Sequence, residues 1–218
     1  MSVPADLGST PLDARERAEL CDLFDELGPS APTMCVGWAT EDLAAHLVVR
    51  ERDPRSMPGI IKPDGRFGRT TVALMAKEKA RGYPVVVQRV RTGPPAVPWR
   101  IPKLRTLLNL NEYVVHHEDV RRANGRGPRT DRPDLDEAIW GMLRRGAKLL
   151  SRRVGAPIVL RRTSGDEIVV RKGEQAAVLT GEPVELLVYL MGRRGSAQVE
   201  LSGGPAAIDK LETAELGI

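Results

Sequence analysis

LRTLLNLNEYVVHHEDVRRANG, residues 104–125, contains the clearest helical pattern of the sequence, and the predicted architecture is built outward from it. Apolar residues recur at three- and four-residue spacings, and Asn124-Gly125 is typical of a helix C-terminus. At about 100° per residue, five polar side chains fall within a sector roughly 80° wide: Arg105, Asn109, Glu112, His116 and Asp119. The neighbouring sector is apolar and contains Leu104, Leu107, Leu108, Val114 and Val115. A helical bundle holds its sites where such a polar stripe borders the apolar seam.

Glu112 and His116 are candidate metal ligands, because residues four apart on a helix lie on nearly the same face. A third ligand must come from elsewhere, and His46 is the one histidine outside this segment. It lies near the apolar side of a second predicted helix, TEDLAAHLVVRERD, which Thr40 caps and which ends at Pro54. Two imidazoles and one carboxylate suit Zn²⁺, and also Ni²⁺ or Fe²⁺, and leave a coordination position for water or substrate. The alternative is that Glu112 and His116 form an ordinary surface pair.

Two further ionisable side chains on or beside this stripe, Asp119 and His117, have two interpretations each. Asp119 either orients His116 from behind or is solvated. His117 turns about 100° away from its neighbour, which makes it an outer partner of the site or a surface residue. Cys21 falls near the apolar stripe of a helix predicted over 11–28, and we expect it in the core.

The rest of the chain divides into a helical part and a smaller α+β part. Before Gly155 we predict further helices over about 69–81, 84–92 and 134–153, with a Gly- and Pro-rich loop over 55–69. After Gly155 the period changes to that of strands. Strands are predicted in IVLRRTSGDEIVVRKG, AAVLTG and AQVELSG, and helices in EPVELLVYLMG and GPAAIDKLETAEL. The predicted fold class is α+β, with a helical bundle over 1–153 and an α+β domain over 154–218.

Composition narrows the class of protein. Of 218 residues, 41% are apolar and 4% aromatic, and 33 basic residues are mixed with 29 acidic ones. A nucleic-acid partner is not expected, because such binders gather positive charge on one face and interleave aromatic residues. Two cysteines give no disulfide framework and no CxxC pair, which favours a reducing, cytoplasmic location. The sequence lacks an apolar leader and a run of eighteen apolar residues, so no membrane association is expected.

Two segments resemble the signatures of a known family. TMCVGWATEDLAAHL, residues 33–47, is similar to the C-x-GW-T-x-x-DLxAHL stretch of the mycothiol-dependent maleylpyruvate isomerase family, within the DinB-like superfamily of four-helix metal-binding bundles. NEYVVHHEDVRRANG, residues 111–125, resembles the second signature of that family. By match of motif, His46, Glu112 and His116 would bind a divalent metal, commonly zinc. The tail, especially residues 181–203, resembles the sterol-carrier-like domain that follows the bundle.

The resemblance implies a reaction class as well as a fold. The metal would bind a low-molecular-weight thiol, mycothiol, and lower its pKa, and the thiolate would attack an electrophilic substrate. A cis-enedione would be isomerised, whereas an alkyl or epoxide carbon would accept the thiol. The nearest subgroup consists of actinobacterial metal-binding proteins without an assigned reaction, so the alternative is a metal- or thiol-binding regulatory module without catalysis. The expected assembly is a monomer or homodimer, and Arg193 or Arg194 either contacts an acidic ligand or is a solvated turn residue.

Overall fold

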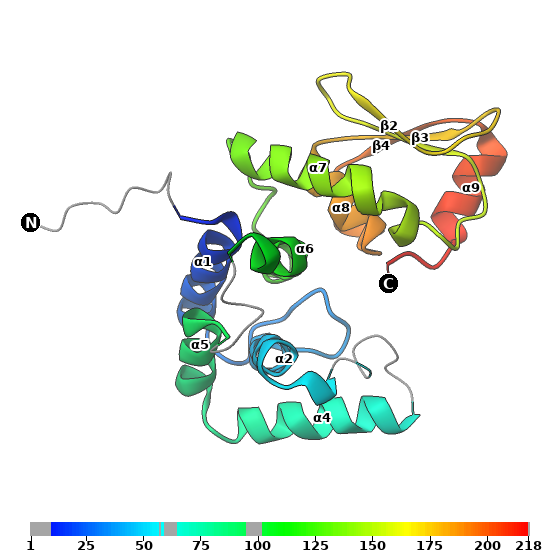
Figure 1. The fold of residues 1–218 in the computed structure, drawn as a ribbon. Coiled ribbons are helices and arrows are strands. Elements are labelled where there is room, and N and C mark those ends of the chain that lie inside the picture. The colour runs from blue at the N-terminus through cyan, green and yellow to red at the C-terminus, as the bar shows by residue number, and fades with distance from the viewer. Residues whose placement is uncertain (1–9, 57, 59–64, 95–101, 218) are drawn as a thin grey trace, which may run out of the picture. The chain divides into compact units, whose positions relative to one another are not determined.

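The computed structural model describes residues 10–56, 58, 65–94 and 102–217, and gives only the backbone of residues 102–108. The chain forms two compact units, Met1–Arg126 and Gly127–Ile218 (Figure 1). This division differs from the predicted boundary at 153/154, because helix α7 (Pro133–Leu150) belongs to the second unit. Its buried apolar side chains pack on helix α8 (Pro183–Leu190) and strand β2 (Glu167–Arg171), and therefore have their partners after residue 153.

The first unit is built from helices whose apolar faces meet in one core. They are α1 (Leu12–Leu27), α2 (Thr40–Arg52), α4 (Gly65–Lys79), α5 (Tyr83–Thr92) and α6 (Pro102–Ala123), with a short 3-10 turn, η1, at Pro54–Ser56. Helix α1 packs against α5 and α6, and α2 packs against α4 and α5. Leu20, Phe24, Leu43 and Leu47 are among the side chains buried in this core. The predicted helices are confirmed, although α4 begins four residues earlier than position 69.

The connection between α1 and α2 is fixed by local hydrogen bonds. Gly28 ends α1 in the left-handed region, at φ 78°, which a residue without Cβ adopts easily. Ala39, not Thr40, precedes the first turn of α2, and its N–H donates to the Asp42 carboxylate at 3.0 Å. The predicted cap at Thr40 is therefore wrong by one residue, and the Thr40 hydroxyl donates instead to the Gly28 carbonyl.

The second unit is a four-stranded sheet covered by helices on one face. The strand order is β2-β1-β3-β4, where β1 is Ile158–Arg161, β3 is Ala177–Thr180 and β4 is Glu200–Gly203. Strand β1 pairs antiparallel with β2 and parallel with β3, and β4 pairs antiparallel with β3. Alternate side chains such as Ile158, Leu160 and Leu179 are fully buried, whereas Val169 is exposed. Every strand and helix predicted after Gly155 is confirmed, including α9 (Pro205–Thr213). None of the helices described is long and apolar enough to cross a bilayer.

Candidate metal centre

The three predicted ligands converge between two helices of the first unit. His46 lies on α2, and Glu112 and His116 lie one turn apart on α6. One ligand atom from each side chain falls within 4.8 Å of the other two. The two imidazole rings cross at 74° with their centroids 5.3 Å apart, and His116 Nε2 is 3.7 Å from Glu112 Oε2. His46 is 7% exposed and His116 is 9% exposed, so the interpretation as an ordinary surface pair is wrong.

Arg50 places a positive charge beside the Glu112 carboxylate. It lies one turn after His46 on α2, so it faces α6 on the same side of the helix. Its Nε is 3.2 Å from Glu112 Oε2, and its Nη1 donates to Asn109 Oδ1 at 2.6 Å. The Glu112 side chain keeps 15% of its surface exposed, which leaves this edge of the site accessible from solvent.

A buried chain of polar side chains continues from Asn109 into the bundle. The Asn109 amide donates to Glu51 Oε1 at 2.8 Å, and the two oxygens of Glu51 accept from Arg17 at 2.6 and 2.7 Å. Arg17 comes from α1, so one network joins α1, α2 and α6. In this network each buried charge has a charged partner. The network therefore fixes the positions of α2 and α6, which carry the candidate ligands, relative to each other.

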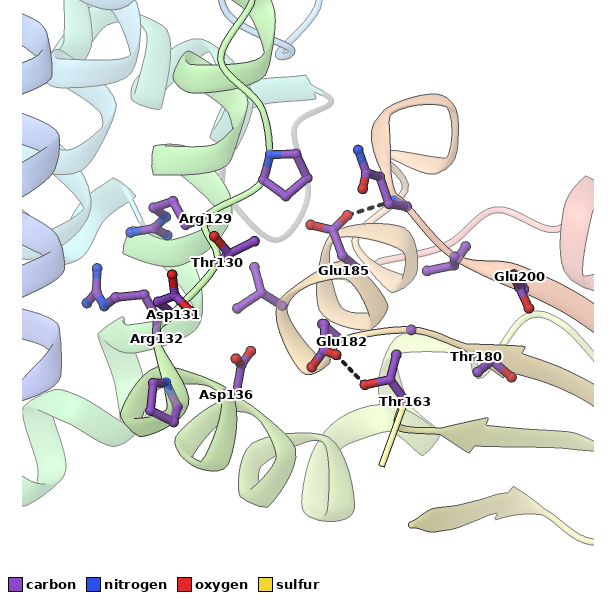
Figure 2. Close-up of a pocket in the computed structure, with 16 residues that line it drawn as sticks. Arg129, Thr130, Asp131, Arg132, Asp136, Thr163, Thr180, Glu182, Glu185 and Glu200 are labelled. Carbon is purple, nitrogen blue, oxygen red and sulfur yellow. Dashed lines mark hydrogen bonds between the residues drawn. The ribbon is translucent and has the colours of Figure 1, made fainter. Parts of the chain in front are cut away.

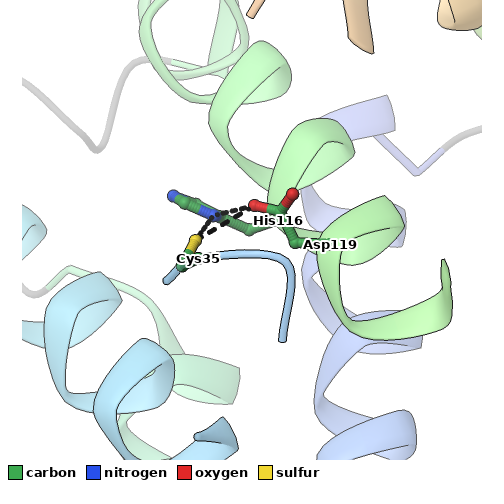
Figure 3. Close-up of side chains that lie close together, drawn as sticks. All are labelled: Cys35, His116 and Asp119. Atoms are coloured by element: carbon green, nitrogen blue, oxygen red, sulfur yellow. Dashed lines mark hydrogen bonds and ion pairs between the residues drawn. The ribbon is translucent and has the colours of Figure 1, made fainter. Parts of the chain in front are cut away.

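Behind His116, Asp119 and Cys35 form a close cluster (Figure 3). Asp119 Oδ2 lies 3.0 Å from His116 Nδ1 and accepts from the Cys35 thiol at 3.3 Å. A carboxylate oxygen can only accept, so His116 Nδ1 carries the proton and Nε2 points toward His46 and Glu112. Asp119 is 1% exposed, so the interpretation of this residue as solvated is wrong. Metal-binding histidines commonly have such a carboxylate behind them.

The two imidazoles of the site have opposite proton affinities. Burial, the neighbouring His116 and Arg50 hold the pKa of His46 well below its usual value, which keeps its imidazole neutral. Burial also opposes the charge of His116, but hydrogen bonds with Asp119 and Cys35 and the nearby Glu112 outweigh it and raise its pKa to about 9. At neutral pH the site therefore holds one imidazole and one imidazolium.

His117 and Cys21 lie outside this set. His117 turns toward α1, where its Nδ1 is 3.3 Å from Glu16 Oε2, and it forms a separate group with Glu16, which is buried, and Glu19, which is partly buried. It is neither a surface residue nor an outer partner of His116. Cys21 is fully buried, as predicted, and burial raises the pKa of its thiol to about 12. Its thiol is therefore protonated and enclosed, which excludes it as a nucleophile at neutral pH.

The second unit contains a cavity of about 990 Å³. It also contains Arg193 and Arg194, the two arginines singled out from the sequence, which are not among the residues that line this cavity. The cavity is lined by several carboxylates, of which Glu182 accepts from the Thr163 hydroxyl and Glu185 from a backbone N–H at 2.7 Å (Figure 2). Arg194 donates to carbonyl oxygens at the C-terminus of α9, and Arg193 donates to a nearby carbonyl at 2.6 Å. Both arginines thus bind backbone of their own unit.

No model of a protein family matches the sequence, and no curated protein gives a significant match. Two solved structures are similar: a mycothiol-dependent maleylpyruvate isomerase and a histidine-to-alanine variant of it. Each has a TM-score of 0.57 and 17% sequence identity, over 88% of this chain and 89% of the other. The protein shares the fold of this isomerase. At that identity the likeness extends to the fold alone.

Three residues of the site were not identified from the sequence as functional. Arg50 sits four positions after His46, and that spacing alone could have placed it beside the ligands. Cys35 and Trp38 lie in the quoted segment 33–47, but their contacts with α6 and with His46 depend on how the connection before α2 folds back. No pattern in the local sequence predicts such a contact.

Proposed function

We propose that this protein binds a divalent metal through His46, Glu112 and His116 and acts as a low-molecular-weight-thiol-dependent transferase or isomerase. The observation that carries the proposal is the convergence of these three side chains, two of them buried, within 4.8 Å. The shared fold with a mycothiol-dependent maleylpyruvate isomerase supports the reaction class. The DinB-like and sterol-carrier-like assignments of the two parts of the chain belong to the same proposal.

The donor set fits the ion. A tetrahedral metal with bonds of about 2.0–2.2 Å needs donor atoms roughly 3.3–3.6 Å apart. His116 Nε2 and Glu112 Oε2 are 3.7 Å apart, so a rotation of one side chain brings them to that spacing. Two imidazoles and a carboxylate suit Zn²⁺ first, and Ni²⁺ or Fe²⁺ next. Three protein donors leave room for one small ligand, which the proposal assigns to the sulfur of mycothiol.

When bound, the metal would supply a Lewis acid that favours the thiolate form of that thiol. The chain itself prepares the donors. Asp119 holds one proton of His116 on Nδ1, so Nε2 is the nitrogen that can bind the ion once its own proton has left. His46 is neutral and ready to donate its lone pair. Arg50 balances the charge of Glu112 and stands close enough to the site to orient an anionic group of the thiol or of an electrophilic substrate.

Metal analysis of the purified protein tests the ligand set. We expect about one equivalent of Zn²⁺ in the wild type and little in His46→Ala and Glu112→Ala. His117→Ala is the matched control, because this histidine lies on the same helix and faces α1. Thermal unfolding of each variant would show that the fold is retained. Normal metal loading in folded His46→Ala and Glu112→Ala would overturn the ligand set.

A thiol-conjugation assay tests the activity. Mycothiol is mixed with a cis-enedione, an alkyl halide or an epoxide, with the metal-loaded protein and with the chelated protein. Metal-dependent turnover of one of these pairs would support an enzyme, whereas metal binding without turnover of any would favour a regulatory or binding module. The cytoplasmic location, the monomeric or dimeric state and the absence of a nucleic-acid partner stay predictions.

A further inference from the structure

One short loop before α2, residues 33–38, contacts both imidazoles of the candidate metal centre. Cys35 Sγ lies 3.3 Å from Asp119 Oδ2 and 3.9 Å from His116 Nδ1. Three residues later, the Trp38 ring packs on the His46 ring, with centroids 5.1 Å apart and an interplanar angle of 51°. The loop thus lies behind the ring of one histidine and beside the ring of the other.

The 33–38 loop is held in place by its own hydrogen bonds. The Thr33 hydroxyl donates to the Trp38 carbonyl at 2.9 Å and accepts from the Cys35 N–H at 3.1 Å. The Trp38 N–H donates to the Cys35 carbonyl at 3.0 Å, and the Met34 N–H donates to the Asp119 carbonyl at 3.2 Å. Asp119 is therefore bound by this loop twice, through its backbone and through its carboxylate. A loop with this many fixed groups can position a side chain.

We infer that the 33–38 loop positions both candidate histidine ligands, through Cys35 and through Trp38. The inference rests on the proposed metal site and adds the residues that orient its donors. The Cys35 thiol fixes the Asp119 carboxylate by donating to it, so Oδ2 stays directed at His116 Nδ1 and Nε2 faces the metal position. The Trp38 ring limits rotation of the His46 imidazole and keeps water from one of its faces. Outer contacts of this kind typically change metal affinity by about 10- to 100-fold.

The test measures Co²⁺ binding to the full chain, by chelator competition and by the ligand-field absorption spectrum. We expect Cys35→Ala and Trp38→Ala each to weaken the Co²⁺ Kd by about 10-fold or more and to change the spectrum. Cys35→Ser keeps a hydrogen-bond donor and Trp38→Phe keeps a ring, so both should restore the wild-type spectrum. Val36→Ala is the matched control, since the Val36 side chain is fully exposed in the same loop. Thermal unfolding of each variant without metal shows whether a weaker Kd comes from loss of the fold or from loss of the histidine orientation.

The outcomes separate this inference from the proposed function. A wild-type protein that does not bind Co²⁺ overturns both. If it binds, and folded Cys35→Ala and Trp38→Ala keep the wild-type Kd and spectrum, the inference alone fails. A sulfur-to-cobalt charge-transfer band that disappears in Cys35→Ser would make Cys35 a ligand, which overturns its positioning role. Because the two pairs of variants act on different histidines, one misfolded variant still leaves the other pair to decide.

Discussion

Metal uptake should depend steeply on pH, because one of the three candidate ligands is protonated at neutrality. Its hydrogen bonds and nearby carboxylates raise the pKa of His116 to about 9. Asp119 accepts the Nδ1 proton, so the proton that must leave before the ion binds is the one on Nε2. A raised pKa means stronger competition from protons, and affinity therefore increases with pH and levels off above about 9.

The size of the pH effect on the apparent Kd depends on the difference between the His116 pKa and the pH of the assay. At pH 7, about two units below the pKa, the proton weakens the apparent affinity about 100-fold, or roughly 2.7 kcal/mol at 1.36 kcal/mol per unit. Between about pH 8.5 and 6.5, each unit of acidification should raise the apparent Kd about tenfold. His46 adds little in this range, because its pKa is held well below the usual value.

Isothermal titration with Zn²⁺ in two buffers of different ionisation enthalpy counts the protons released, and we expect about one at pH 7. Chelator competition at three pH values gives the slope of the Kd. Asp119→Asn is the control: it removes the carboxylate that raises the His116 pKa, and the slope near pH 8 should flatten. A wild-type Kd that does not change from pH 6.5 to 8.5, with no proton released, would refute this account of His116.

Three further predictions concern stability. Arg17→Met leaves Glu51 buried without its ion-pair partner, and we expect urea unfolding to show a loss of about 3–5 kcal/mol; a loss of less than about 1 kcal/mol would contradict a buried pair. Leu160→Ala removes a fully buried side chain from β1 and should cost about 2–5 kcal/mol in the same assay, whereas an unchanged midpoint would place that side chain outside the core. Gly203→Ala puts a Cβ, at φ 104°, against the carbonyl of Ala176, the residue just before β3, and should lower stability by about 1–3 kcal/mol. Gly195→Ala, whose Cβ would meet open space, is its control, and equal melting temperatures of the two variants would oppose this reasoning.

The sequence predicted the elements with clear periodicity and missed those that depend on distant contacts. The stripe of α6 was visible because its polar and apolar positions alternate at helical spacing, and Asn109, Glu112, His116 and Asp119 do meet partners along it. The start of α4 was missed because Gly65 and Gly68 resemble loop residues, although Gly68 is buried.

Buried charge was the other feature that periodicity could not predict. Asp13, Glu16 and Arg17 are buried in the first half of α1, where a hydrophobic pattern would assign them to solvent. Their placement follows from tertiary pairing, as in the bond from Arg17 to Glu51. The division of the chain after Arg126 likewise depends on what α7 packs against, and the helix pattern of α7 says only that one of its faces is apolar.

The ion pair between Arg50 and Glu112 bears on how the proposed metal would be exchanged. In many small metalloproteins, metal binding is coupled to folding, so stripping the ion unfolds the chain. Here the Arg50 guanidinium lies beside the Glu112 carboxylate, so the carboxylate keeps a counter-charge when no metal is bound. Chelation should therefore yield a folded chain that can be reloaded, and competing divalent ions can replace one another without passing through a denatured state.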